Sequence, residues 1–221
     1  MNAGLILAGG TGERLTGFSK PKQFINICRK PLASYCLQVF EDSADIGMIC
    51  VVAATEWRSM LGKYVYAAPG RSRQHSIYNG LLALEKYAPE RVVIHDAVRP
   101  FVTCADISGV IASSIDCDGA MPVLPVTDTV YQSTDGKTIT ASLNRDILVA
   151  GQTPECYSFN KYLAIHEALS DKQLSDIRGS SELAVYGNMR IALSKGSYNN
   201  FKITTNADFE RFCSIINGEF L

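Results

Sequence analysis

Short apolar runs and stretches with helical spacing alternate along most of the chain. Leu5 to Ala8 form an apolar run followed at once by glycines, which is typical of a buried parallel strand that ends in a tight turn. Similar runs predict strands at about 48–54, 64–67, 91–95, 120–124, 190–193 and 201–203. Apolar residues recur at helical spacing over about 32–40, 56–61, 77–84, 107–115, 160–169 and 209–216. This alternation predicts an α/β fold: a mainly parallel twisted sheet with helices on both faces.

The alternation breaks after Pro125. Two β-prone segments at 129–132 and 138–142 flank the turn sequence Ser-Thr-Asp-Gly and predict a polar hairpin. An isolated two-stranded ribbon is at best marginally stable in water, so we expect this arm, about 129–145, to pack on a second copy of the chain. The length of 221 residues fits one domain, 1–221, from which the arm protrudes.

Charge and cysteine content exclude several classes of partner. The 21 Lys and Arg residues nearly balance the 22 Asp and Glu residues, so the composition gives no general attraction to nucleic acid or membranes, and any anion site must be local. The seven cysteines are scattered without a C-x-x-C pair, which argues against disulfide and zinc frameworks. The sequence shows no signal peptide and no apolar run near the ~18 residues of a membrane span. We therefore expect a cytoplasmic protein without nucleic-acid or membrane partners.

The segment after the first predicted strand is the first candidate for binding chemistry. It consists of Gly9, Gly10, Thr11 and Gly12, followed by Arg14. Glycines allow close approach of a ligand, and successive N–H groups at a turn form an anion-binding concavity, although a simple tight turn is the alternative. The G-K-[ST] ending of a Walker A loop is absent, and Leu15 occupies the third glycine position of a dinucleotide fingerprint. A dehydrogenase is therefore disfavoured.

Basic residues recur in the loops that follow. The long polar stretch 11–30 contains Lys20 and Lys22, which could balance the charge of a polyphosphate or be solvated. Two arginines and two serines at 71–76 precede a helix, which either Ser72 or Ser76 could cap. These loops are candidates for a cationic site.

A carboxylate and a further lysine come from later in the chain. Asp96 ends a buried strand, at the edge where open α/β sheets bind ligands, and could hold a divalent metal or a ribose hydroxyl, or cap a helix. Lys202 lies among apolar residues, so it either reaches outward to solvent or points at an anion. His95 and His166 are interpreted as structural histidines.

Taken together, seven segments occur in the order found in one enzyme family. They are Gly10-Thr11-Gly12-x-Arg14, Pro21-Lys22-Gln23, 70–76, His95-Asp96-Ala97-Val98-Arg99-Pro100, 125–129, Gly151-Gln152-Thr153-Pro154 and Lys202-Ile203-Thr204-Thr205. From about Ala3 to Phe209 the chain resembles the cytidylyltransferases that act on polyol phosphates, a family that includes the methylerythritol 4-phosphate and ribitol 5-phosphate enzymes. The resemblance implies a Rossmann-like nucleotidyltransferase domain and a homodimer formed through the arm.

The resemblance also implies roles for individual residues. Those matching nucleotide-binding positions are Ala8, Gly9, Gly10, Thr11, Gly12, Gly70, Arg73, Ser76, Asp96 and Arg99. Those matching catalytic cations are Arg14, Lys22 and Lys202. Asp96 matches the carboxylate near Mg²⁺ or another divalent cation, and Asp96, Ser142 and Arg145 are expected to bind the acceptor.

Departures from the family pattern bear on the acceptor. The methylerythritol enzymes carry an arginine, contributed across the dimer, where 157–160 here has none, and the motif at 175–179 also differs from theirs. The segments 97–101, 151–154 and 169–173 look closer to the ribitol-phosphate enzymes. We expect transfer of CMP from CTP to D-ribitol 5-phosphate for cell-wall or capsule polysaccharides, releasing pyrophosphate. One alternative is the same transfer to methylerythritol 4-phosphate, for isoprenoid synthesis. Two further alternatives are a sugar-1-phosphate nucleotidyltransferase and a non-catalytic nucleotide-binding regulator.

Overall fold

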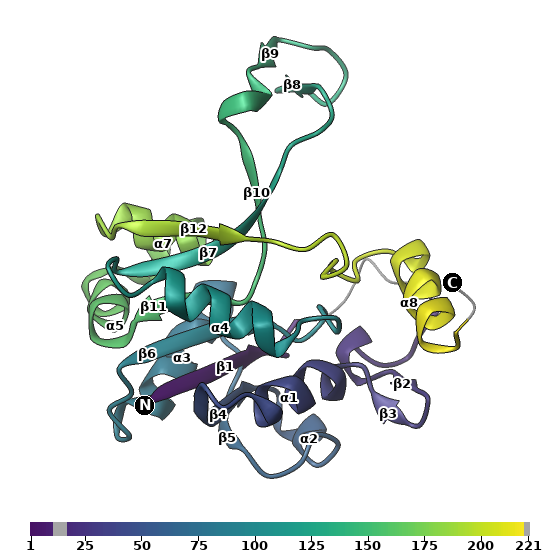
Figure 1. Ribbon diagram of the computed structural model, residues 1–221, viewed down its shortest axis with the longest axis vertical. Helices are drawn as coiled ribbons and strands as arrows, with labels where there is room; N and C mark the ends of the chain where they lie inside the picture. Colours follow the sequence, from purple (N-terminus) through teal and green to yellow (C-terminus); the bar gives the residue numbers. More distant parts are fainter. Residues whose placement is uncertain (11–16, 219–221) are drawn as a thin grey trace.

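The structure is a computed structural model that describes residues 1–10 and 17–218. Its centre is a twisted sheet, in which the strand order is β10-β7-β11-β6-β1-β4-β5 and β12 pairs with β7 (Figure 1). These strands are β1 (Asn2–Leu7), β4 (Ile46–Val52), β5 (Val65–Ala67), β6 (Arg91–Asp96), β7 (Gly119–Pro125), β10 (Val149–Gly151), β11 (Glu155–Ser158) and β12 (Ile191–Lys195).

The sheet combines a parallel half with an antiparallel insertion. β1 pairs in parallel with both β4 and β6, β4 with β5, and β12 with β7. β11 lies antiparallel between β6 and β7, and β10 is antiparallel to β7. The predicted α/β fold with a mainly parallel sheet is confirmed. The two antiparallel strands were not predicted, because they are short and their sequence lacks a continuous apolar run.

Helices cover both faces of the sheet, as predicted. They are α1 (Ala33–Asp42), α2 (Thr55–Arg58), α3 (Arg73–Glu85), α4 (Cys104–Ser113), α5 (Phe159–Ala168), α6 (Asp171–Asp176), α7 (Ser180–Tyr186) and α8 (Asn206–Ile216). Leu5 packs with α3, α5 and α7 on one face, whereas its neighbour Ile6 packs with α1 and α4 on the other. Because successive strand residues point to opposite faces, one buried strand serves both cores. None of the described helices is long and apolar enough to cross a membrane.

A third, smaller core lies beside the sheet and holds two segments, the ribbon at 26–31 and the stretch at 201–203. Phe212 of α8 packs with Ile27, Val98 and Ile203 in this cluster. Ile27 belongs to the short ribbon β2 (Asn26–Ile27) and β3 (Lys30–Pro31), which follows the 3₁₀ helix η1 (Lys22–Phe24). The prediction of a strand at 201–203 is wrong: this extended segment joins no sheet, and Ile203 N–H donates instead to the carbonyl of Val98 at 2.9 Å.

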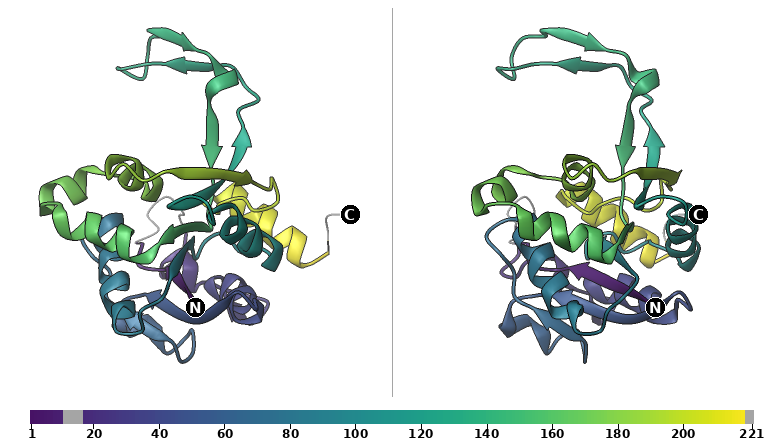
Figure 2. Two further views of the ribbon diagram at one scale, coloured as in Figure 1. Left: turned by 60° about the vertical axis from the view of Figure 1, so that its left-hand side comes forward. Right: turned by 90° about the vertical axis from the view of Figure 1, so that its left-hand side faces the viewer.

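The predicted hairpin is present and projects away from the sheet (Figures 1 and 2). Its strands are β8 (Val130–Gln132) and β9 (Ala141–Leu143), which pair antiparallel, and η2 (Arg145–Ile147) leads back to β10. The second strand begins three residues later than predicted, because the Asp135 carboxylate accepts the backbone N–H groups of Lys137 and Thr138 and holds them in the turn.

Candidate active site

A cavity of about 630 Å³ opens at the carboxyl ends of the central parallel strands. Its lining consists of Leu7, Gly9, Gly10, Lys22, Gln23, Gly70, Arg71, Ser72, Arg73, Ser76, Asp96, Val98 and Lys202. Leu7 ends β1 and Asp96 ends β6, and the two residues pair across the sheet. The cavity therefore lies at the sheet edge where open α/β folds bind ligands.

Many of the predicted site residues meet in this cavity. The lining includes the predicted residues Gly9, Gly10, Lys22, Gly70, Arg73, Ser76, Asp96 and Lys202. Ala8 is buried directly beneath the loop, at 2% exposure. Thr11, Gly12 and Arg14 lie outside the described residues. Segments from very different parts of the chain thus contribute to one cavity, although the roles of these residues stay predictions.

The glycine-rich loop is held by a glutamine to which the sequence motif gave no role. The Gln23 side-chain amide donates to the carbonyls of Ala8 and Gly10, both at 2.7 Å. A Cβ on Gly9 would lie 2.7 Å from Cβ of Pro69, so this position requires glycine for the close approach of the two loops. Gln23 was identifiable as part of the motif at 21–23, but only the fold brings it beneath the loop.

The opposite wall of the cavity is the turn before α3. Ser72 is the residue that caps this helix: its hydroxyl accepts the backbone N–H of His75. Ser76 closes the turn, because its hydroxyl accepts the N–H of Gly70 at 3.0 Å and donates to the carbonyl of Ser72 at 3.0 Å. A Cβ on Gly70 would lie only 2.9 Å from the backbone nitrogen of Ser76. The turn is therefore tight and preformed.

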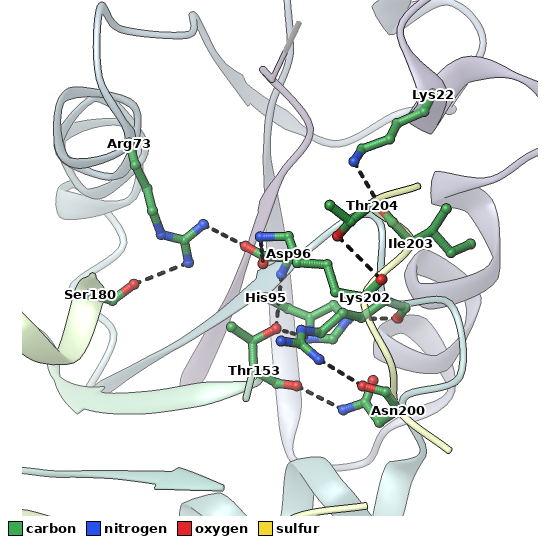
Figure 3. Close-up of polar contacts among 11 residues, drawn as sticks. Lys22, Arg73, His95, Asp96, Thr153, Ser180, Asn200, Lys202, Ile203 and Thr204 are labelled. Atoms are coloured by element: carbon green, nitrogen blue, oxygen red, sulfur yellow. Dashed lines mark hydrogen bonds and ion pairs between the residues drawn. The ribbon is translucent and has the colours of Figure 1, made fainter. Parts of the chain in front are cut away.

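Asp96 lies between two cations (Figure 3). One carboxylate oxygen pairs with Arg73, and the other pairs with the Lys202 ammonium at 2.8 Å. Burial by itself raises the pKa of this carboxyl, but the charges of Arg73 and Lys202 outweigh burial and hold the pKa well below its usual range. Asp96 is therefore ionised at any physiological pH, and it does not cap a helix.

Lys22 reaches the cavity from the other side. Its side chain is 8% exposed, and its ammonium donates to the carbonyl of Ile203 at 2.8 Å. Of the two lysines in the early loop, Lys22 lines the cavity, whereas Lys20 lies over the ring of Trp57, 6.0 Å from its centroid. Lys22 thus connects its own loop to the segment that carries Lys202.

Arg73 has a second set of neighbours, which the sequence gave no reason to single out. Its guanidinium also donates to the Ser180 hydroxyl at 3.2 Å, at the start of α7. Glu155 is buried nearby, and burial raises the pKa of its carboxyl; the hydroxyl of Ser181 donates to it at 2.8 Å. Glu155 belongs to the unpredicted strand β11, so only the tertiary structure places this carboxyl beside Arg73.

His95 is buried and does not titrate in the physiological range. Burial lowers its pKa to about 4, and Nε2 lies 3.0 Å from the carbonyl oxygen of Arg99. The Arg99 guanidinium, predicted to bind nucleotide, does not line the cavity but donates to the backbone carbonyl of Asn200 at 2.7 Å. In this structure Arg99 therefore holds the backbone of the segment that carries Lys202.

The two acceptor-binding residues predicted on the arm are far along the chain from this cluster and do not line the cavity. Ser142 pairs with Tyr131 within the hairpin, and the Arg145 guanidinium donates to the carbonyl of Thr127. Both are exposed on the arm that extends from the body (Figure 2). Within one chain, the structure does not bring them to the cavity.

The cavity offers few ligands for a divalent cation. Asp96 is the carboxylate among the lining residues, and the described part of the chain holds no cluster of three or more His, Cys, Asp or Glu residues suited to a metal. Mg²⁺ keeps several waters and binds through one or two carboxylates together with substrate phosphates. The site thus fits a cation shared with a bound polyphosphate.

Comparisons with known proteins agree with this geometry. A family model described as IspD, 2-C-methyl-D-erythritol 4-phosphate cytidylyltransferase, matches residues 3–217. The chain is 32% identical over 219 residues to the bifunctional enzyme IspD/IspF of Allorhizobium ampelinum, covering 93% of this chain and 54% of that protein. It is 30% identical over 224 residues to the ribitol-5-phosphate cytidylyltransferase of Streptococcus agalactiae serotype Ia, covering 96% of this chain and 94% of that protein.

The solved structures show the same fold. The 2-C-methyl-D-erythritol 4-phosphate cytidylyltransferase of Thermus thermophilus matches with a TM-score of 0.80 at 23% identity, covering 98% of this chain and all of that one. The chain spans about half the length of the bifunctional relatives. The family model matches nearly the whole length of the chain, and the glycine-walled cavity with its cations agrees with that match. The chain therefore belongs to the IspD family of cytidylyltransferases.

Proposed function

We propose that this protein transfers CMP from CTP to a polyol phosphate, giving a CDP-polyol and pyrophosphate. The observation that carries the proposal is the arrangement of Asp96 between Arg73 and Lys202, with Lys22 opposite, in a glycine-walled cavity at the sheet edge. This arrangement has the charge and shape to hold a polyphosphate next to a sugar. Family membership supports the same reaction class.

The nucleotide lies between the two preformed walls. The loop at 8–10, continued by Thr11, Gly12 and Arg14, receives the triphosphate, because glycines expose backbone N–H groups to phosphate oxygens. The turn formed by Gly70 and Ser76 borders the cytosine. The cavity volume of about 630 Å³ is within the range typical of sites for ligands of this size.

The chemistry is an in-line displacement at the α-phosphorus. An oxygen of the polyol phosphate forms a new bond to that phosphorus as the bond to the pyrophosphate oxygen breaks, and pyrophosphate leaves. A phosphomonoester has a second pKa of ~6, so the attacking oxygen is already ionised at neutral pH and needs no general base. Arg14, Lys22 and Lys202 stabilise the charge that develops, which is the main task in phosphoryl-transfer sites.

Asp96 has three roles in this proposal. It orients Lys202 through their ion pair, and it would hold Mg²⁺ or another divalent cation when that ion binds together with the nucleotide phosphates. The ion would supply additional positive charge at those phosphates. Asp96 also lies where it can accept a hydroxyl of the ribose or of the acceptor.

D-Ribitol 5-phosphate is the acceptor we propose first. The Streptococcus agalactiae relative, whose length is almost fully covered, carries that name, and the segment 157–160 lacks the arginine found in methylerythritol enzymes. Methylerythritol 4-phosphate is the second candidate, because the family model and the bifunctional relatives carry the IspD name. Ser142 and Arg145 would contact the acceptor from the arm of a second copy, which makes a homodimer part of the proposal.

A cytoplasmic location completes the proposal. It is supported by Cys36, Cys50 and Cys156, which are buried free thiols and suit a reducing compartment.

The decisive experiment is incubation of the protein with CTP, Mg²⁺ and one of three acceptors, followed by mass spectrometry of the products. The acceptors are ribitol 5-phosphate, methylerythritol 4-phosphate and glycerol 3-phosphate. We expect CDP-ribitol and pyrophosphate to form fastest. CDP-methylerythritol as the dominant product would favour the second candidate. Binding of CTP without release of pyrophosphate with any acceptor would contradict the proposal and indicate a nucleotide-binding regulator. Replacing CTP by UTP, GTP or ATP in the same pyrophosphate-release assay tests the alternative of a sugar-1-phosphate nucleotidyltransferase that uses another base.

A further inference from the structure

Four residues next to Asp96 and Lys202 form a closed ring of hydrogen bonds, and Figure 3 labels three of them, His95, Thr153 and Asn200. We call it the polar ring, and its members are Arg99, Asn200, Thr153 and His95. The Arg99 guanidinium donates to the backbone carbonyl of Asn200 at 2.7 Å, and the Asn200 side-chain amide donates to the carbonyl of Thr153 at 2.8 Å. The Thr153 hydroxyl lies 3.1 Å from Nδ1 of His95, and Nε2 of His95 lies 3.0 Å from the carbonyl of Arg99.

The direction of every bond in the polar ring follows from the chemistry of the groups. The carbonyl of Arg99 can only accept, so Nε2 of His95 carries the proton and donates. In a neutral imidazole Nδ1 then accepts, which makes the Thr153 hydroxyl the donor to it. Each member thus donates to the next, around the whole ring. Burial lowers the pKa of His95 and so keeps the imidazole neutral, which leaves Nδ1 free to accept.

Three members of the polar ring are buried, Arg99 is half-buried, and all four lie outside the cavity lining. His95, Thr153 and Asn200 have exposures of 0%, 5% and 2%, and none of them lines the cavity. They belong to three separate segments: the end of β6, the residues before β11 and the extended stretch after β12. Among the described residues, Arg99 Nε and Asn200 Oδ1 are buried without a hydrogen-bond partner, so the four bonds of the ring are the ones that hold its members in one arrangement.

The polar ring connects the two partners of the central ion pair. The Thr153 hydroxyl also accepts the backbone N–H of Asp96 at 3.2 Å, and Lys202 follows Asn200 by two residues. The segment that carries Lys202 belongs to no strand, and its backbone is held on both sides of the lysine. The Ile203 N–H donates to the carbonyl of Val98 on one side, and Asn200 contacts Arg99 and Thr153 on the other. Since a lysine stem is flexible, the position of its backbone decides where the ammonium can reach.

We propose that Asn200 and Thr153 are positioning residues, which set the placement of Lys202 relative to Asp96 for phosphoryl transfer. This inference rests on the proposed function and deepens it. Neither residue lines the cavity: Asn200 acts through the backbone that carries Lys202, and Thr153 through Asp96 and His95. A displacement of about 1 Å in a reacting group can lower a rate ~10²-fold, so loss of either contact has a kinetic effect out of proportion to its effect on stability.

The test is steady-state kinetics of pyrophosphate release with the best acceptor. Asn200→Ala is expected to lower kcat ~10²-fold while the KM for CTP stays within ~3-fold, because the cavity lining is intact. Asn199→Ala, a substitution at an exposed neighbour in the same segment, is the matched control and should behave as wild type. A folded Asn200→Ala protein with kcat within ~3-fold of wild type, or one in which only the KM rises, overturns the proposal.

A second pair of variants keeps the proposal testable should Asn200→Ala fail to fold. Thr153→Val removes the hydroxyl and should lower kcat by a similar factor, whereas Thr153→Ser keeps it and should restore most of the activity. Equal kcat values for these two variants would contradict the assignment of a role to the hydroxyl.

A measurement that does not depend on catalytic activity distinguishes failure of this inference from failure of the proposed function. In ¹⁵N NMR of the free protein at pH 7, His95 is expected as the neutral tautomer with the proton on Nε2, and Thr153→Val should perturb its Nδ1 signal. If wild type makes no product with any acceptor while these signals behave as stated, the proposed function fails and the polar ring stands as a structural device. A proton on Nδ1 overturns the ring itself.

Discussion

At the scale of single residues, the site holds its charges in place before any ligand arrives. Asp96 accepts from both Arg73 and Lys202, so neither cation needs to be recruited from solvent. Electrostatic stabilisation of this preorganised kind costs no reorganisation at the moment of reaction.

The first prediction concerns the two lysines of the cavity. Lys22→Ala or Lys202→Ala should lower kcat for CDP-polyol formation ~10²-fold or more, comparable to removal of one preorganised donor in other enzymes. Pyrophosphate release gives the rate. Lys20→Ala is the matched control, since Lys20 lies in the same loop but is exposed and outside the cavity. Near-wild-type turnover by a folded Lys22→Ala protein would refute the catalytic assignment.

The second prediction concerns pH and two buried histidines. Burial lowers the pKa of His95 and of His166 to about 4, from 6.5 in the unfolded chain. Between pH 6.5 and pH 4 the unfolded state binds more protons than the native state, so the free energy of unfolding falls as the pH falls. The loss approaches about 3 kcal/mol per histidine.

Urea unfolding at pH 5 and pH 7 measures this effect. We expect a lower midpoint at pH 5, and we expect His166→Leu to reduce the difference between the two pH values by about half, since one of the two histidines is gone. Glu155, whose pKa burial raises, acts in the opposite direction, because its contribution is present at low pH and is lost as the pH rises. An unchanged pH difference in His166→Leu would argue against a buried neutral histidine at that position.

At the scale of elements, the loops that end the parallel strands are shaped by close backbone approach. The third prediction is that Gly70→Ala raises the KM for CTP ~10-fold, equivalent to about 1.4 kcal/mol of lost binding. The added Cβ would lie 2.3 Å from Cβ of His75 and 2.9 Å from a backbone nitrogen, so the turn that borders the cavity has to open. Gly109→Ala in α4 is the control, because its Cβ meets no atom within 4 Å. Equal KM values for both variants would contradict a role for the turn.

Helices α6 and α7 are absent from the prediction, although both carry local sequence signals of a helix start. α6 begins with a capping box of Ser170 and Gln173, and at the start of α7 the Glu182 carboxylate accepts the backbone N–H of Gly179. Such signals at a helix start are readable in a sequence. Both helices are too short to show a clear apolar period, which is why periodicity alone missed them.

At the scale of the whole molecule, the arm projects away from the body of the chain. It carries exposed apolar side chains, with Ile139 at 67% and Ile147 at 79% exposure. Isolated ribbons are marginal, and exposed apolar groups concentrated on a projection mark an interaction surface. The homodimer that the sequence predicts would cover this surface, and it stays a prediction.

The fourth prediction tests this dimer. Sedimentation equilibrium should give twice the mass of the chain at micromolar concentration, and Ile147→Arg should weaken association ~10-fold or more, because a charge would be buried in an apolar contact. Ile115→Arg, at another exposed apolar position that lies on the body, is the control. A wild-type protein that is monomeric throughout the micromolar range would refute a dimer through the arm.

The sequence by itself determined the class of fold and the composition of the site. Buried strands and amphipathic helices follow from the periods of apolar residues, because each element must bury one face. Glycines at 9, 10 and 70, and the charged residues Lys22, Asp96 and Lys202, were identifiable because few residue types suit close backbone approach or anion binding.

Only the tertiary structure decided how these residues meet. It placed Asp96 between two cations, set the Arg99 guanidinium on the Asn200 carbonyl rather than in the cavity lining, and buried Glu155 beside Arg73 through a strand that the sequence pattern did not reveal. The segment 201–203, predicted as a strand, is instead held by the Ile203 N–H on the carbonyl of Val98 and by the third core. Contacts between residues a hundred positions apart depend on packing of whole elements, and no local pattern encodes them.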